Sequence, residues 1–302
     1  MENQSIALAK MINANFKLID YNPPYFLKKF PILGKLYVPY FLRQKLETDI
    51  LPSIIITTGR RMAGTSIALK SILKNNVKTI HIQNPKLSLK NFDLLLIPEH
   101  DWIKGKNVIQ TKGALCFFEE KDFKKFKEPN LKKIKTKKNT VLLMVGGNSK
   151  KQKPDNSEYF ELSTKVIQGV KNLDAQLLIT MSRRTPNKAV KILQSTFSKH
   201  LSDFKILSSD ENNLYPKILE IIDYAIVTSD SVSMISELST LTKPLFIFHF
   251  SKENRKITFF ISNLKELSIV KDYNGDLFKF KKSKLQTNKI TISQVNKFFG
   301  FK

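Results

Sequence analysis

Short apolar runs alternate along the chain with longer segments in which apolar residues recur every three to four positions. The short runs predict buried strands, and the three-to-four spacing predicts amphipathic helices. We expect strands at 53–57, 79–83, 92–97, 107–110, 140–145, 175–180, 204–207 and 245–248, and one that ends at Val227. We expect helices at 2–14, 65–74, 157–173, 188–197, 214–222, 253–267 and 292–299, and one around Met234–Leu238. This alternation predicts two successive α/β arrays, each built on a parallel sheet.

A lysine-rich segment interrupts the pattern between the two arrays. Residues 121–138 contain nine lysines and show no apolar period, which is typical of a linker or an exposed edge. We therefore expect a first domain at 1–132, a second at 133–270 and a tail with a final helix at 271–302. Two such domains would face one another across a cleft at their strand ends, where open α/β sheets bind ligands.

The stretch from Ile226 to Phe248 is the most informative part of the second array. There an apolar run meets a turn of small polar residues, and a helix follows that Pro244 stops. Such a turn leaves the first helix amides free, and the amides and the helix dipole attract an anion such as phosphate. The alternative is that Asp230 or Ser231 caps the helix. The candidate binding residues here are Thr228, Asp230, Ser231, Val232, Ser233 and Met234.

Two other strand ends of the second array also carry candidate binding residues. Gly146 and Gly147 follow the strand at 140–145, and paired glycines let a backbone approach a ligand closely. They match neither a Walker loop nor a GxGxxG fingerprint, so the signal is weak by itself. The full set is Gly146, Gly147, Asn148, Ser182, Arg183 and Arg184.

In the first array, Gly59 and Arg60 stand on a strand-to-helix turn, where the arginine could face a phosphate, the opposite domain or solvent. His100 and Asp101 end the strand at 92–97, a place and a residue pair that suit general acid–base chemistry. The alternative for His100 is a structural histidine.

Composition narrows the class of protein. The chain has 302 residues, a formal net charge of +25 and only six arginines among its 51 basic residues. A polyanionic partner is one explanation, but a nucleic-acid-binding protein usually shows arginine clusters and a recognition module, and this chain has neither. Its single cysteine, Cys116, excludes an internal disulfide and argues against a cysteine-based zinc site, which favours a reducing cytoplasm.

Residues 21–46 combine aromatic and cationic side chains with four prolines. This combination suits an anionic membrane surface, with rings in the headgroup layer and lysines on lipid phosphates. The alternative is a loop that packs on the first domain. The alternating residues are Tyr25, Phe26, Phe30, Tyr37, Tyr40 and Phe41 with Lys28, Lys29, Lys35, Arg43 and Lys45. No apolar run approaches the roughly 20 residues that span a bilayer, so the expected location is cytoplasmic, with peripheral attachment at most.

Several segments in order along the chain resemble the bacterial and plant proteins of the mitochondrial fission ELM type. They are Glu2–Ala9, Gly59–Arg61, Phe92–Asp101, Asn107–Leu115, Val145–Lys150, Leu177–Pro186 and Val227–Glu237. The stretches SRRTP and TSDSVSMISE are the specific ones. The resemblance implies the GT-B glycosyltransferase fold, with two Rossmann-like domains facing a cleft.

By this resemblance the second domain would hold a nucleotide diphosphate sugar without a cofactor or metal. Ser231, Val232 and Ser233 would present amides to the diphosphate, and Glu237 would accept the ribose hydroxyls. Arg183 and Arg184 would hold phosphate or base, and His100 and Asp101 would approach from the acceptor side.

Two positions depart from the family pattern. The family usually has a strand and a glycine-containing loop before Glu2, whereas this sequence begins at Met1, so the first domain is expected to lack that strand unless the start lies upstream. Thr242 replaces a glycine before the Lys-Pro pair.

Three functions follow from the resemblance. The first is a metal-independent glycosyltransferase that acts on a membrane-linked or envelope acceptor. The second is a non-catalytic adaptor at a membrane surface, and the third is a nucleotide-sugar epimerase.

Overall fold

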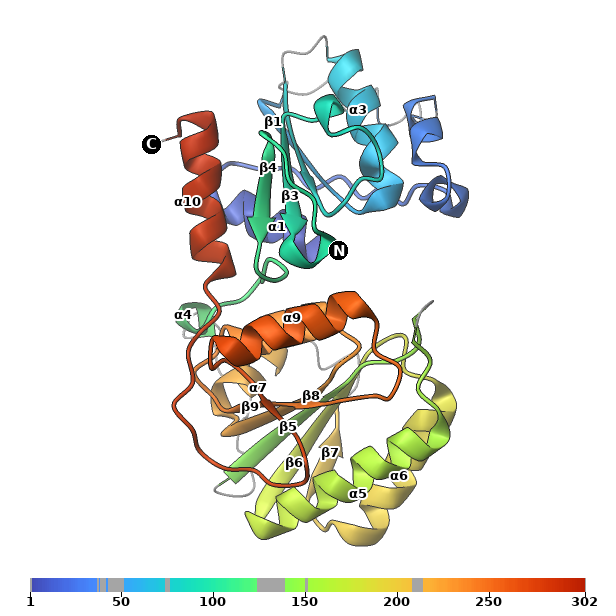
Figure 1. The fold of residues 1–302 in the computed structure, drawn as a ribbon, viewed down its shortest axis with the longest axis vertical. Helices are drawn as coiled ribbons and strands as arrows, with labels where there is room; N and C mark the ends of the chain where they lie inside the picture. Colours follow the sequence, from blue (N-terminus) through green and yellow to red (C-terminus); the bar gives the residue numbers. More distant parts are fainter. Residues whose placement is uncertain are drawn as a thin grey trace. The chain divides into compact units, whose positions relative to one another are not determined.

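The computed structural model describes residues 2–36, 38, 42, 52–73, 77–123, 139–149, 152–207 and 214–301. It divides into two units, shown as ribbons in Figure 1. Unit 1 comprises Met1–Phe117 with Gln286–Lys302, and unit 2 comprises Phe118–Leu285.

Unit 1 is built on a parallel sheet in the order β1-β2-β3-β4. Alternate residues of β3 pack on opposite faces of this sheet, as the period of a strand requires. Leu94 and Leu96 join the core under α1 and α10, whereas Leu95 and Ile97 join the core under α3. The elements are α1 (Glu2–Met11), η1 (Tyr25–Lys28), η2 (Pro31–Lys35), β1 (Ile54–Thr58), η3 (Arg60–Met62), α3 (Ala63–Ile72), β2 (Lys78–Ile82), η4 (Leu89–Asn91), β3 (Leu94–Pro98), η5 (Glu99–Asp101), β4 (Val108–Thr111) and α10 (Thr287–Phe299), where η marks a 3₁₀ turn.

Unit 2 is built on a second parallel sheet, in the order β10-β9-β8-β5-β6-β7. Helices cover both faces, α5 and α6 on one and α7, α8 and α9 on the other (Figure 1). The elements are α4 (Glu120–Phe123), β5 (Asn139–Val145), α5 (Asn156–Asn172), β6 (Ala175–Met181), α6 (Asn187–His200), β7 (Phe204–Ile206), α7 (Tyr215–Ile221), β8 (Tyr224–Thr228), α8 (Val232–Ser239), β9 (Leu245–Phe248), α9 (Arg255–Glu266) and β10 (Lys271–Asp272).

The central strand β5 is recognisable in the sequence as a continuous apolar run. Its residues from Thr140 to Val145 are all buried, because helices cover both faces of a parallel sheet. Leu142 and Met144 enter the core on the α7–α9 face, and Val141, Leu143 and Val145 enter the core on the α5–α6 face. The first helix after it begins with a capping box formed by Asp155 and Glu158.

The boundaries of the two units differ from the division at residue 132 and the separate tail at 271–302 that the charge pattern predicts. The last helix returns to unit 1 and begins at Thr287 rather than near 292. The Asn288 side-chain amide donates to the Cys116 carbonyl over 2.8 Å and its oxygen accepts the Cys116 amide over 3.0 Å. Val295 is fully buried against α1 and the sheet of unit 1. Residues 124–138 of the lysine-rich segment lie outside the described residues.

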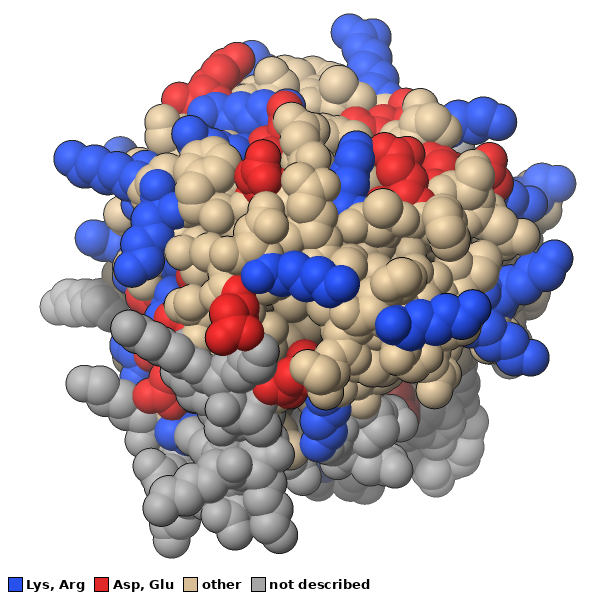
Figure 2. Space-filling model, turned by 90° about the horizontal axis from the view of Figure 1, so that it is seen from below, with Lys and Arg blue, Asp and Glu red and all other residues tan. Residues whose placement is uncertain are grey.

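Positive charge is spread rather than gathered on the face of the molecule seen in Figure 2, where acidic side chains lie among the lysines and arginines. None of the helices in the described ranges is both long and apolar enough to cross a membrane.

Candidate functional site

Open α/β sheets bind ligands at the point where the chain leaves two neighbouring strands in opposite directions. In unit 2 this switch point lies between β5 and β8, which pair in parallel. The chain leaves β5 toward β6 on one side, and β8 pairs on the other side. The predicted turns at Gly146 and Thr228 therefore meet at the carboxyl ends of adjacent strands.

The buried carboxylate of Asp230 links the two turns at this switch point. The amide of Gly146 donates to Thr228 Oγ1 over 2.8 Å, and the amide of Gly147 donates to Asp230 Oδ2 over 2.7 Å. The Thr228 hydroxyl donates in turn to Asp230 Oδ1 over 2.7 Å. Burial raises the pKa of Asp230, while the hydrogen bonds from Thr228 and Gly147 and the nearby Arg184 oppose that rise. The two glycine amides are thus already engaged within the protein.

This packing gives the paired glycines a physical reason that differs from the approach of a ligand. A Cβ atom on Gly146 would lie 2.1 Å from both carboxylate oxygens of Asp230. A Cβ atom on Gly147 would lie 2.2 Å from the carbonyl oxygen of Arg184. Only glycine lets the chain's own side chain and backbone come so close at these two positions.

The SRRTP loop is fastened to the same turn. The Asn148 amide donates to the Arg184 carbonyl over 3.0 Å, and Thr185 Oγ1 donates to the Gly146 carbonyl over 2.6 Å. Arg184 Nη2 lies 3.5 Å from Asp230 Oδ2, which places a partly exposed cation beside the buried carboxylate. Ser182 Oγ accepts the Arg184 amide over 3.1 Å, so this side chain shapes the loop. Arg183 is exposed.

The start of α8 resolves the choice between a helix cap and free amides. Ser231 occupies the N-cap position, yet no side chain caps the helix, and Asp230 turns its carboxylate to Gly147 and Thr228 instead. Within the described part of the chain, no acceptor is found for the amides of Val232, Ser233 and Met234. The first turn of α8 therefore keeps the free amides and the positive end of the helix dipole that an anion requires.

A partly buried lysine lies at the opposite end of α8. Lys282 directs its ammonium to the carbonyl oxygens of Leu238, Ser239 and Leu241 at the end of the helix. Cations are favourable at this end because the last carbonyls have no partner within the helix. Burial nevertheless lowers the pKa of Lys282 to about 7.

Glu237 lies further along α8 and meets a residue that the sequence does not single out. Its carboxylate Oε2 accepts a hydrogen bond of 2.9 Å from the hydroxyl of Tyr215 on α7. Burial raises the pKa of Glu237 to about 7, and the Tyr215 hydrogen bond opposes this rise. In the sequence Tyr215 is only a residue beside Pro216 at a helix start, so no local signal marks it as a partner of Glu237.

A second cluster that the sequence does not reveal surrounds His249, directly after β9. His249 Nδ1 lies 2.6 Å from Glu253 Oε1, and Nε2 lies 2.6 Å from Asp272 Oδ1 on β10. The hydrogen bond to Glu253 is the main cause that raises the pKa of His249, and Asp272 adds to it. Two carboxylates on the two ring nitrogens favour the doubly protonated ring.

The candidates in unit 1 occupy separate places. Gly59 has a φ of 88°, a conformation that favours glycine, and its amide donates to the Ile82 carbonyl over 3.0 Å. Arg60 Nη2 donates to the Lys29 carbonyl over 3.4 Å, so this arginine contacts the chain's own backbone. His100 and Asp101 form η5 after β3, where His100 is buried and Asp101 is partly exposed.

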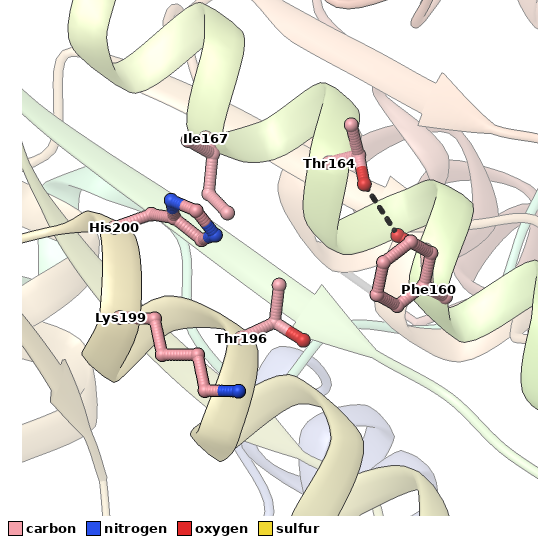
Figure 3. A pocket seen from close by; sticks show the side chains of 6 residues that line it. All are labelled: Phe160, Thr164, Ile167, Thr196, Lys199 and His200. Carbon is pink, nitrogen blue, oxygen red and sulfur yellow. Dashed lines mark hydrogen bonds between the residues drawn. The ribbon is translucent and has the colours of Figure 1, made fainter.

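A groove elsewhere in unit 2 lies apart from this site. It has a volume of about 280 Å³ and lies between α5 and α6, as Figure 3 shows. It is lined by Phe160, Thr164, Ile167, Thr196, Lys199 and His200, none of which belongs to the strand-end site. No set of three or more His, Cys, Asp or Glu side chains in the described ranges is arranged to hold a metal ion.

Comparison with known proteins decides the family. The model of the family described as mitochondrial fission ELM1 matches residues 1–297. This chain belongs to the mitochondrial fission ELM1 family. An uncharacterised protein of Rickettsia prowazekii (strain Madrid E), RP120, is 29% identical over 316 residues, covering 91% of this chain and 88% of that protein. Mitochondrial fission protein ELM1 of Arabidopsis thaliana is 24% identical over 256 residues, covering 77% of this chain and 60% of the plant protein.

Solved structures confirm the predicted fold for this ELM1-family chain. The UDP-GlcNAc 2-epimerase of Methanocaldococcus jannaschii in complex with UDP-GlcNAc and UDP matches with a TM-score of 0.57 at 10% identity, covering 99% of this chain and 96% of that one. The UDP-GlcNAc 2-epimerase of Neisseria meningitidis bound to UDP-GlcNAc matches with a TM-score of 0.55 at 12% identity, covering 99% and 89%. The likeness shows an α/β fold of the GT-B kind with parallel sheets.

Proposed function

We propose that this ELM1-family protein binds a nucleotide diphosphate sugar at the start of α8 and transfers the sugar to an acceptor. The observation that carries the proposal is the uncapped first turn of α8, with Glu237 on the same helix. Free amides and the helix dipole suit a diphosphate, and a carboxylate suits the two hydroxyls of a ribose. Solved structures of this fold whose titles name UDP-GlcNAc or UDP as ligand support the choice of ligand class.

Each candidate residue has a distinct role in this proposal. The amides of Val232, Ser233 and Met234 bind the diphosphate, and the exposed Arg183 lies on the loop that is hydrogen-bonded to the turn after β5. Asp230 is a positioning residue, because its carboxylate fastens the Gly146–Gly147 turn to the end of β8.

The transfer step needs charge stabilisation and a base. The bond between the sugar C1 and the diphosphate oxygen breaks as a bond from C1 to an acceptor oxygen forms. The leaving nucleoside diphosphate gains negative charge, which the α8 amides and the arginines stabilise without a metal ion. The acceptor hydroxyl gives its proton to a base, for which we propose His100 or Asp101 of unit 1. The proposed acceptor is membrane-linked or part of the cell envelope.

Calorimetric titration with UDP, UDP-GlcNAc and guanosine diphosphate sugars tests the binding site. Ser233→Glu places a carboxylate in the exposed first turn of α8, which favours the helix dipole but repels a diphosphate. We expect it to weaken binding at least about tenfold, because a like charge there opposes the ligand. Ser293→Glu puts the same charge on an exposed position of α10 and serves as the matched control.

Glu237→Gln tests the ribose contact. Hydrogen bonds to a charged group are worth about 1.5–3 kcal/mol, so the loss of a carboxylate acceptor should weaken nucleotide binding about tenfold or more. Wild-type affinity should also rise with pH through about 7, because the ionised carboxylate is the better acceptor. A folded protein that binds none of these nucleotides would refute the proposal and favour a non-catalytic adaptor.

An epimerase is the second candidate, because the solved structures reported above are UDP-GlcNAc 2-epimerases. Incubation with UDP-GlcNAc in the absence of any acceptor separates the two. An epimerase inverts the sugar at C2 under these conditions, whereas a transferase leaves the sugar unchanged and releases UDP only when an acceptor is added.

A further inference from the structure

Residues 25–36 of unit 1 present an unusual number of exposed apolar side chains. They fold into the two 3₁₀ turns η1 and η2, drawn as blue turns beside α3 in Figure 1. Leu36 is 84% exposed, Tyr25 64% and Phe30 49%, and Phe26, Ile32 and Leu33 are each at least 40% exposed. A cluster of large apolar side chains that faces water within one short segment marks an interaction surface. We call residues 25–36 the apolar platform.

The platform is fastened to unit 1 through its backbone. A Cβ atom on Gly64 would lie 2.0 Å from the Pro31 carbonyl oxygen and 2.8 Å from Gly34, so η2 rests directly on the start of α3. Arg61 Nη1 donates to the Pro23 carbonyl over 2.9 Å, just before the platform. The exposed side chains therefore stand on a held backbone, which lowers the entropy cost of binding.

The same segment carries only positive charge. Lys28, Lys29 and Lys35 lie within it, and no acidic residue does. The Lys28 ammonium lies 5.6 Å from the centre of the Tyr25 ring, and the Lys29 ammonium lies 5.4 Å from the centre of the Phe30 ring. Cations beside exposed aromatic rings combine the two contributions that hold proteins on anionic lipid, which are burial of rings at the headgroup layer and attraction to phosphate.

We propose that the apolar platform docks this protein onto the surface of an anionic lipid bilayer. The positive charge favours an anionic membrane rather than a second copy of the chain as the partner of the platform. Two copies, each with a net charge of +25, would bring like charges together there. The short 3₁₀ turns reach only the interfacial layer, since crossing a bilayer takes roughly 20 apolar residues in a helix. Docking on the bilayer through the apolar platform does not require a bound nucleotide sugar.

Vesicle flotation with the full chain tests the platform. Vesicles of phosphatidylcholine alone are compared with vesicles that also contain phosphatidylglycerol. We expect wild type to float with the anionic vesicles, and we expect a platform variant to bind at least about tenfold more weakly, because three apolar contacts are lost. The platform variant is Phe30→Ser, Ile32→Ser and Leu36→Ser, and its control, with the same three exposed residue types elsewhere, is Phe160→Ser, Ile290→Ser and Leu267→Ser.

A second pair of variants separates the platform from the high charge of the whole chain. The platform charge variant is Lys28→Gln, Lys29→Gln and Lys35→Gln, and its control with the same net charge in unit 1 is Lys104→Gln, Lys106→Gln and Lys112→Gln. We expect the platform charge variant to lose more binding than its control, with the gap closing as salt is raised. Equal binding of both platform variants and their controls would overturn the proposal. So would sedimentation of wild type as a dimer that only the platform variants dissociate, if vesicle binding is absent.

Discussion

The burial of Glu237 predicts a pH-dependent change in the free energy of unfolding that is measurable with no ligand present. Its carboxyl group is largely buried on α8, with a hydrogen bond from Tyr215, and its pKa rises from 4.5 to about 7. We choose the substitution Glu237→Gln, which keeps the shape of the side chain and an oxygen that can accept the Tyr215 hydrogen bond but removes the charge.

The sign and size of the effect follow from the pKa. A carboxyl group whose folded pKa is above its unfolded value stabilises the fold below about 4.5, and that contribution is lost as the pH rises through about 7. One pKa unit corresponds to about 1.36 kcal/mol, so the full rise corresponds to about 3 kcal/mol. Glu237 keeps some contact with solvent, which screens part of this cost, and we expect about 2 kcal/mol.

Urea unfolding measured at about pH 5 and about pH 8 provides the assay. Glu237→Gln should raise the free energy of unfolding of unit 2 relative to wild type by about 2 kcal/mol more at the higher pH than at the lower. Circular dichroism follows the whole chain, and fluorescence of Trp102, the single tryptophan of the sequence, follows unit 1. The control is Glu266→Gln, at an exposed position of α9.

An equal difference between Glu237→Gln and wild type at both pH values would show that burial does not raise the pKa of Glu237. An equal pH-dependent gain in Glu266→Gln would show that the effect comes from net charge rather than from the burial of one carboxyl group.

Three further predictions concern other contacts. Gly147→Ala should destabilise unit 2 by about 2 kcal/mol, because its Cβ atom would meet a backbone carbonyl, and Gly105→Ala should cost less in chemical denaturation because its nearest neighbour is a side-chain methyl group. Asn288→Ala should lower the stability of unit 1 by about 1–3 kcal/mol in tryptophan-detected unfolding, because it removes two buried hydrogen bonds to the Cys116 backbone, whereas Gln294→Ala on the exposed side of the same helix should change it little. In ¹⁵N NMR spectra both ring nitrogens of His249 should remain protonated above the ordinary titration range of histidine, and a neutral ring at about pH 6 would contradict the two carboxylate contacts.

The periodicity of the chain predicts the elements and the fold class well. The run predicted at 140–145 appears as the buried part of strand β5, and burial on both faces explains why Val141 to Val145 are all apolar. The final helix was predicted too short, because its first turn is built from buried polar residues such as Asn288 that carry no apolar period. The hydrogen bond between Asn288 and the Cys116 backbone joins residues 286–302 to unit 1. The charge pattern of the sequence cannot reveal this long-range contact.

The location of the candidate site could be predicted from the sequence, but the contacts of its residues could not. Its location at the ends of β5, β6 and β8 follows from the order of apolar runs and polar turns. The functions of the individual residues within it do not. Gly146 and Gly147 look like places for a ligand to approach, but the structure packs Asp230 and the Arg184 backbone against them.

The sequence by itself determined that this protein is a two-part α/β chain with small polar residues and glycines where its strands end, because burial and turn chemistry act on neighbouring residues. Only the tertiary structure decided which of those polar groups are already satisfied. Asp230 binds the amide of Gly147, Tyr215 binds Glu237, and the amides at the start of α8 stay uncapped. These contacts join residues from different strands and helices, and their geometry is set by strand register and packing, which no local pattern encodes.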